Sequence, residues 1–445
     1  MPYALPLAPY LILKNMSATT TILKKPKGFK WLEESPIVFV FYVSISAFII
    51  YACMYGFRKP FTAATYEHET WMGISYKVCL VIAQVIGYML SKFYGIKVIG
   101  TMRRENRAKA IVIIIGVAWL TLLVFAIVPR PFNIICMLLN GLPLGMVWGL
   151  VFSYLEGRRI TELLGAVLAT SFIFGSGLAK SVGKWLLGTM GVSEWWMPFA
   201  AGGIFIIPLF ICVWLIDKAP HPGPEDIAQR TGRRPMSKEE RQGFIKRFGL
   251  ALTPIITTYV MLTILRDFCE DFANELWIET GYVNNAYLFT QNSTYTSIML
   301  LAVIGGFFLI KNNYKAFQLN HWIIAFGFIL AATTTYLFHL HLISPIIWML
   351  FATSGLYLGY VPYNCFYFER LLAAFKVEGN VGFVMYIADA FGYMGTVLVL
   401  LIKEFMTVKY NWVDFFSFLF YVSACVGIVL VLISVRLFSN LHQKQ

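Results

Sequence analysis

The chain has 445 residues, of which 58% are hydrophobic and only 13% charged, and its formal net charge is +13. Soluble globular domains carry about 25% charged residues, so this composition excludes a soluble domain. Apolar stretches close to the ~20 residues that a bilayer core requires recur along the chain, which predicts an all-α polytopic membrane protein.

Twelve transmembrane helices are predicted. In chain order they cover residues 36–58, 73–97, 110–128, 134–155, 164–187, 197–216, 250–277, 292–310, 320–340, 344–366, 379–402 and 413–437. Lys and Arg gather in short loops on alternate sides of these spans, at 24–30, 103–109, 156–159, 230–247, 311–315 and after Arg436. The positive-inside rule accounts for this pattern without a nucleic-acid partner. It predicts two cytoplasmic termini, and we expect a bacterial inner (plasma) membrane.

A polar break lies at residues 217–249, where we predict a cytoplasmic linker. It starts with "DKAPHPGPED", whose prolines and glycine exclude a helix. Further on, Ser237 and Glu240 form a capping-box pattern ahead of a basic helix, which we expect to lie on anionic lipid. The linker separates two six-helix halves, 36–216 and 250–437, and a cytoplasmic segment (1–35) and tail (438–445) flank them.

The two halves share short sequence echoes at a nearly constant separation. "GLPLGMV" (141–147) matches "GLYLGYV" (355–361), "GAVLATSFIFG" (165–175) matches "GFVMYIADAFG" (382–392), and "VIGYML" (85–90) matches "VIGGFFL" (303–309). The separations are 214, 217 and 218 residues. This regularity predicts a duplication that produced two pseudo-symmetric halves, an organisation that places a substrate site between them.

Two arginines occupy matching positions in this repeat. Arg58 follows Tyr51 by seven residues in "YACMYGFRKPFTAATYE" (51–67). Arg266 follows Tyr259 by seven residues in "YVMLTILRDFCEDFANELW" (259–277). We therefore expect the two arginines to face one central cavity from opposite sides, where their fork-shaped donors suit an anion.

The architecture resembles the major facilitator superfamily, with six plus six spans, a basic central loop and a basic loop after the second span. Within that superfamily, "YGFRKPFTAA", "GMVWG" (145–149) and "LRDFCEDF" resemble patterns of the organophosphate:phosphate antiporters. The resemblance implies a secondary active transporter that moves a small organic anion, such as a phosphorylated metabolite, by alternating access. It implies phosphate or a proton as counter-substrate, no cofactor and a monomeric chain.

Other charged residues lie at about the same depth in the predicted spans as Arg58 and Arg266. A charge at mid-bilayer costs about 3 kcal/mol even on lenient scales, so each needs a partner or a wet cavity. We expect Lys77 and Lys180 to line the cavity, with an ion pair to Asp389 as the alternative for either lysine. Arg58 has the alternative of snorkelling to the membrane interface, and Arg266 that of pairing with Glu270 one helical turn on.

The C-terminal part of the seventh predicted span is unusually acidic. Asp267, Asp271 and Glu275 recur at a spacing of four, which predicts one shared helical face. Lys59 is the expected partner of Asp271, and this pair would close the outer gate in an inward-facing state. Two alternatives remain open: one of the carboxylates, Glu270 included, titrates and couples transport to protons, or the motif is a solvated helix end.

Aromatic residues recur on the spans expected around the cavity. They are Tyr51, Tyr55, Trp148, Tyr259, Tyr363 and Tyr386, which either stack on a sugar or ring of the substrate or serve in packing. The seven cysteines are scattered singly, and "HLH" (339–341) has no third ligand, so no metal site is expected.

Three classes of function compete at this stage. The first is transport of an organic anion, with proton-coupled transport of a neutral or sugar-like solute as a variant. The second is a transporter-like sensor that binds such a ligand and signals through the 217–249 linker. An enzyme is not expected, because the sequence has no Ser/His/Asp set, metal cluster or nucleotide-binding loop.

Overall fold

The computed structural model describes residues 35–67, 69–155, 161–220, 236–283, 285–307, 310–377, 382–406 and 410–444. The expected segment 1–35, apart from its last residue, and the middle of the expected linker, 221–235, lie outside these ranges.

The described chain is almost entirely helical. The N-terminal half contains α3 (Pro36–Tyr55), a short 3₁₀ turn (Pro60–Ala63), the hairpin strands β1 (Thr70–Trp71) and β2 (Ile74–Ser75), α4 (Tyr76–Thr101), α5 (Arg104–Ile127), α6 (Asn133–Leu144), α7 (Val147–Leu155), α8 (Thr161–Gly188) and α9 (Met197–Asp217). The C-terminal half contains α11 (Lys238–Asp271), α12 (Ala273–Glu279), α13 (Tyr287–Phe307), α14 (Asn313–His339), α15 (Pro345–Pro362), α16 (Phe368–Ala374), α17 (Gly382–Phe405) and α18 (Trp412–Gln443).

Each predicted span coincides with a helix or with a broken helix. The fourth span is divided into α6 and α7, with Pro143 near the division, and the tenth into α15 and α16 with a wider helical turn (Tyr363–Tyr367) between them. Nine helices or joined helices within the described ranges are long and apolar enough to cross a membrane. Counted with α4, α13 and α17, which are 26, 21 and 24 residues long, they account for the twelve expected spans.

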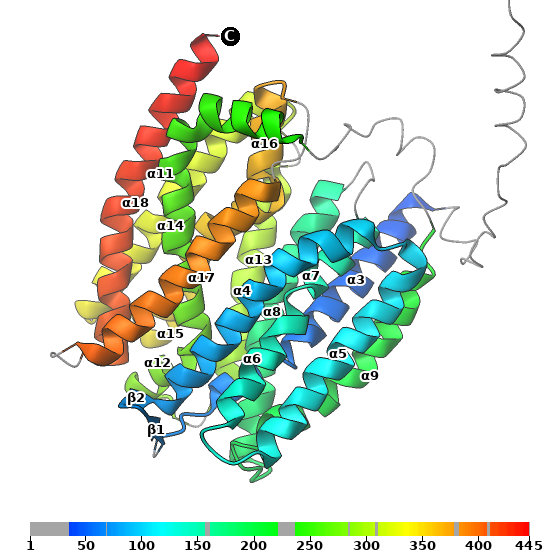
Figure 1. Ribbon diagram of the computed structural model, residues 1–445. Coiled ribbons are helices and arrows are strands. Elements are labelled where there is room, and N and C mark those ends of the chain that lie inside the picture. The colour runs from blue at the N-terminus through cyan, green and yellow to red at the C-terminus, as the bar shows by residue number, and fades with distance from the viewer. Residues whose placement is uncertain are drawn as a thin grey trace, which may run out of the picture.

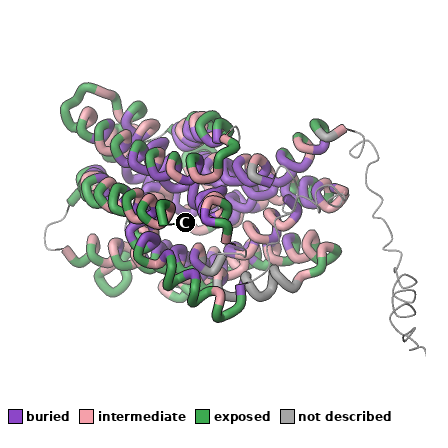
Figure 2. Tube along the Cα trace, turned by 90° about the horizontal axis from the view of Figure 1, so that it is seen from above, coloured by how far each residue is buried: buried purple, intermediate pink, exposed green. Residues whose placement is uncertain are grey.

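The helices form two bundles that lie side by side (Figure 1). The bundles contact each other where α8 packs against α13 and α4 packs against α17. Buried residues gather toward the middle of the molecule and exposed residues toward its rim (Figure 2). Large apolar side chains such as Ile113 and Leu120 of α5, and Ile207 and Trp214 of α9, are exposed on this rim. An apolar outer surface over a helical interior is what a lipid bilayer requires.

The seventh span differs from the expectation in two ways. The Ser237–Glu240 capping box is present, but the basic helix that it starts continues without a break into the span, so α11 has 34 residues. The expected separate surface helix is therefore the first part of α11, which lies across the end of the bundle in Figure 1. At its other end α11 stops at Asp271 and α12 begins at Ala273, because Phe272 leaves the helical conformation. Glu275 therefore does not share a continuous helical face with Asp267 and Asp271.

A glycine makes the close contact between the bundles. A Cβ atom on Gly177 of α8 would overlap the Ser293 side chain and the Phe289 carbonyl of α13. Without a side chain at this position, the backbones of α8 and α13 approach each other directly. Tight packing of this kind through small residues is typical of membrane helices.

Candidate functional site

Arg58 lies just beyond the end of α3, in a turn that fixes its backbone. The Arg58 amide donates to the Tyr55 carbonyl at 3.0 Å. Its own carbonyl accepts a 3.0 Å hydrogen bond from Gln84 Nε2 of α4, which also donates to Asn140 Oδ1 of α6 at 2.9 Å. Arg58 is only 5% exposed, so the interface-snorkelling alternative is wrong.

The Arg58 guanidinium contacts aromatic rings in place of carboxylates. Its central carbon lies 3.9 Å from the centroid of the Tyr88 ring and 5.7 Å from that of Tyr55. Its Nε atom is buried and has no hydrogen-bond partner among the described residues. Cation–π contacts hold the group in place, and they leave its N–H donors for a ligand.

Arg266 has a different environment. Its Nε and Nη2 donate to Asp267 Oδ1 at 3.0 and 2.6 Å, and Nη1 donates to the Tyr360 hydroxyl. The second oxygen of Asp267 accepts from Thr396 Oγ1 at 2.9 Å. The expected alternative, a pair between Arg266 and Glu270, is therefore wrong. A carboxylate bonded to the guanidinium compensates the charge of Arg266, whereas no described carboxylate is in such contact with Arg58.

Both arginines line one cavity between the bundles, with an empty volume of about 410 Å³. Its walls come from both halves and are formed by Tyr51, Tyr55, Arg58, Tyr88, Lys92, Trp148, Phe172, Arg266, Tyr360, Asn364, Asp389 and Tyr393. The Tyr88 and Tyr393 rings, 5.6 Å apart, meet across the two halves. We refer to this space as the arginine cavity.

The structure places three of the predicted aromatic residues, Tyr51, Tyr55 and Trp148, in this wall. Tyr259 lies outside the lining, stacked on Tyr360 at 5.4 Å, and its hydroxyl donates to Asp389. Tyr363 also lies outside, with its hydroxyl 2.7 Å from that of Thr258. The side chain of Tyr386 falls outside the described part of the chain.

Half of the residues that line the arginine cavity are not predicted from the sequence. The residues not anticipated are Tyr88, Lys92, Phe172, Tyr360, Asn364 and Tyr393. Of these six, Lys92 has the clearest sequence signal, because it interrupts an apolar span. In the structure its Nζ lies 3.4 Å from Asp389 Oδ2. Asp389 therefore pairs with Lys92, and the expected alternative that it pairs with Lys77 or Lys180 is wrong.

Three further lysines cross from the N-terminal half to carboxylates of the C-terminal half. Lys59 pairs with Asp271, as expected from the sequence. Lys77 Nζ lies 2.5 and 2.7 Å from the two carboxylate oxygens of Glu275. The expectation that Lys77 lines the arginine cavity is therefore wrong: it is a buried partner of α12.

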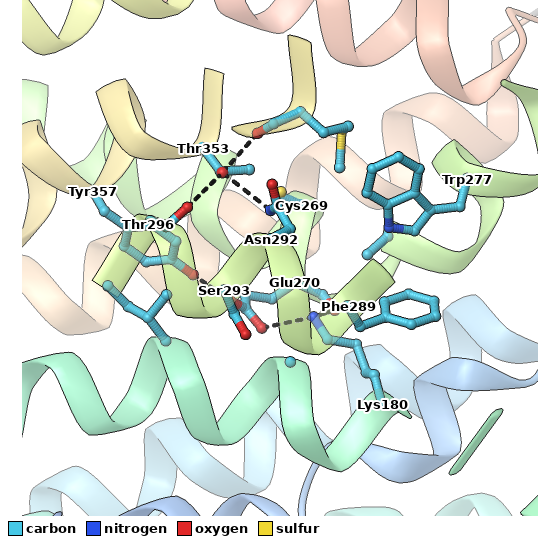
Figure 3. A pocket seen from close by; sticks show the side chains of 14 residues that line it. Lys180, Cys269, Glu270, Trp277, Phe289, Asn292, Ser293, Thr296, Thr353 and Tyr357 are labelled. Carbon is cyan, nitrogen blue, oxygen red and sulfur yellow. Dashed lines mark hydrogen bonds and ion pairs between the residues drawn. The ribbon is translucent and has the colours of Figure 1, made fainter. Parts of the chain in front are cut away.

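The third lysine, Lys180, lines a second cavity and not the arginine cavity (Figure 3). Its Nζ lies 3.0 Å from Glu270 Oε2, and Ser176 and Tyr357 also donate to this carboxylate. The second cavity has an empty volume of about 390 Å³. Asn292 also lines this cavity; its Nδ2 donates to Thr353 at 3.2 Å, and its Oδ1 is buried without a partner among the described residues.

A family model described as "Family of unknown function (DUF5690)" matches residues 60–441. No curated protein sequence matches the chain. Among solved structures, a D-xylose–proton symporter is similar with a TM-score of 0.57 and 16% identity, covering 89% of this chain and 97% of that one. The nucleoside transporter NupG gives 0.55 and 16%, covering 90% and 98%. The human organic anion transporter MFSD10 (TETRAN) gives 0.51 and 12%, covering 87% and 98%.

These likenesses extend over almost the whole chain, and at such low identity they establish the fold. The chain has the all-α polytopic fold of the major facilitator type, as the sequence predicts, and it is an integral membrane protein. Membership of the organophosphate:phosphate branch stays a hypothesis.

Proposed function

The chain belongs to the DUF5690 family, whose description names no activity, and we propose that it is a secondary active transporter of a small organic anion. One observation carries the proposal. Arg58 and Arg266, one from each half, line the same cavity at the interface between the bundles, and no carboxylate among the described residues is in ion-pair contact with the Arg58 guanidinium. A buried cation without a partner is costly, and a bound anion would supply the missing partner.

The ion pairs between the halves support alternating access. Lys59–Asp271, Lys77–Glu275 and Lys180–Glu270 all join the bundles around the start of α12 and the end of α11. They would close one end of the arginine cavity and would have to separate for that end to open. With both termini in the cytoplasm, as proposed from the loop charges, this end faces outward, and the described state is closed to the outside.

The second cavity supports a role in coupling. Glu270 accepts hydrogen bonds from both halves there, so its ion pair with Lys180 must break when the bundles part. A proton on Glu270 would neutralise the carboxylate and weaken its hold on Lys180. We therefore place proton coupling at Glu270, and the name of the proton symporter among the similar structures agrees with such a mechanism.

The competing function is a sensor that binds the same ligand without moving it. A screen of carboxylated and phosphorylated metabolites for those that raise the thermal unfolding midpoint would identify ligands. Uptake of a labelled hit into proteoliposomes then separates the two functions. A transporter equilibrates or accumulates the ligand inside the vesicles, whereas a sensor binds it and leaves the interior empty.

A further inference from the structure

The charges around the arginine cavity do not cancel. Among the described residues, its cations are Arg58, Arg266 and Lys92. Two carboxylates face them: Asp267 bonds to Arg266, and Asp389 pairs with Lys92. Within the described part of the chain, Arg58 is then the cavity cation that has no carboxylate in ion-pair contact.

The Arg58 guanidinium is also buried, so a ligand would have to meet it inside the cavity. Arg58 is 5% exposed, and its Nε atom is buried with no hydrogen-bond partner in the part of the chain that the structure describes. A ligand with one negative charge would complete the set, because its acid group could accept from Arg58 while the two existing pairs stay intact. A second negative charge would have to break an existing pair or remain unpaired in a low-dielectric site.

The rest of the wall is aromatic. Tyr51 and Trp148 meet edge to face at 5.0 Å, Trp148 and Phe172 at 6.4 Å, and Phe172 and Tyr360 at 6.1 Å. This wall runs from α3 through α7 and α8 to α15, so both halves contribute to it. Rings of this kind bind planar ring faces by offset or edge-to-face contact.

Resting on the function proposed above, we infer that the arginine cavity takes a singly charged acid that carries a planar ring, with the acid group on Arg58 and the ring against Trp148. An aromatic or heteroaromatic monocarboxylate has this chemistry. A phosphate monoester at neutral pH does not, because its charge lies between about −1.5 and −2.

The test uses the full-length protein in detergent and four probes: benzoate, its neutral analogue benzamide, its saturated analogue cyclohexanecarboxylate, and the dianion terephthalate. Titration of the thermal unfolding midpoint gives an apparent affinity for each. We expect benzoate to bind at least about tenfold more tightly than each of the other three. The Arg58→Gln variant should lose the benzoate response, whereas Arg247→Gln, which removes an exposed arginine that does not line the cavity, should keep it.

A variant that changes the charge of the cavity should change the preference between singly and doubly charged ligands. Asp389→Asn removes one carboxylate and preserves its shape, so the net charge of the groups around the cavity rises by one. We expect this variant to improve terephthalate binding relative to benzoate by about tenfold or more.

Three results would overturn the inference. One is tighter binding of terephthalate than of benzoate to the unmodified protein. The second is an Asp389→Asn variant with an unchanged preference, and the third is no response to any probe. If dianions bind in an Arg58-dependent way, the anion-binding function survives and only the single charge is refuted. If benzamide binds as well as benzoate and independently of Arg58, the proposed function fails as well.

Discussion

The Arg58 guanidinium lies 3.9 Å from the centroid of the Tyr88 ring. Tyr88 in turn contacts Tyr393 of the other half at 5.6 Å, and the Arg266 guanidinium lies 5.7 Å from the Tyr393 ring. The two arginines are thus connected through a pair of tyrosines that crosses the interface between the bundles. Their contacts resemble each other, but their charges are compensated differently, and this difference leads to the first two predictions.

Arg58→Lys should weaken anion binding by about ten- to a hundredfold, which corresponds to the 1.5–3 kcal/mol typical of hydrogen bonds to charged groups. Lysine keeps the charge but loses the planar fork and the ring stacking. Ligand titration of the purified protein measures the effect. An unchanged affinity would mean that Arg58 does not contact the ligand.

Arg266→Gln should act mainly on stability. The substitution leaves Asp267 buried without its cation, and loss of one partner of a buried pair costs up to about 3–5 kcal/mol. Arg58→Gln, in contrast, leaves no described carboxylate without its ion-pair partner and should not destabilise the protein to a comparable extent. Thermal unfolding of the ligand-free proteins compares the two variants, and equal destabilisation would show that their charges are compensated alike.

The Lys59–Asp271 pair should behave as a coupled unit. Single charge reversals, Lys59→Asp or Asp271→Lys, each place two like charges together and should reduce transport strongly. The double reversal restores an ion pair and should recover part of the activity. Full additivity of the two single losses would argue against a gate formed by this pair.

Glu270→Gln tests the proposed coupling site. The amide cannot release or take up a proton, so uptake driven by a pH gradient should fall to the level seen without a gradient. Exchange of labelled for unlabelled substrate needs no net proton movement and should persist. Gradient-driven uptake that survives in this variant would place the coupling group elsewhere.

Gly177→Val tests the close contact between α8 and α13. Valine would overlap the Phe289 carbonyl, so the closed arrangement of this end should be disfavoured. Cys269 is buried and lines the second cavity. In a background where the other six of the seven cysteines are replaced by serine, its labelling by a water-soluble maleimide should become faster. An unchanged labelling rate would show that the contact can accept a side chain.

Much of the fold follows from the sequence because apolar length is a local property. Each predicted span coincides with a helix, and the Tyr–Arg repeat correctly placed Arg58 and Arg266 at one cavity. The partners of each ion pair are harder to predict from the sequence, because they depend on how each helix is rotated about its axis. Only Lys59–Asp271 was anticipated, whereas Lys77 and Lys180 have partners on α12 and α11.

Other parts of the site gave little signal. Tyr88 and Tyr393 line the cavity, but nothing in the sequence distinguishes them from tyrosines that pack or face the membrane interface. The helix break at Phe272 places Glu275 on a separate helix, but no proline or glycine at this point of the sequence predicts it. These features depend on tertiary packing and not on local propensity.

The most direct test of an anion transporter built around Arg58 is uptake into proteoliposomes. The ligand that most raises the unfolding midpoint should be supplied in labelled form to vesicles containing either the unmodified protein or Arg58→Lys. We expect saturable uptake by the unmodified protein, half-saturated near the concentration that gives half-maximal stabilisation. Uptake by Arg58→Lys should need a concentration about ten- to a hundredfold higher. Binding without uptake by the unmodified protein, or equal uptake by both proteins, would contradict this function.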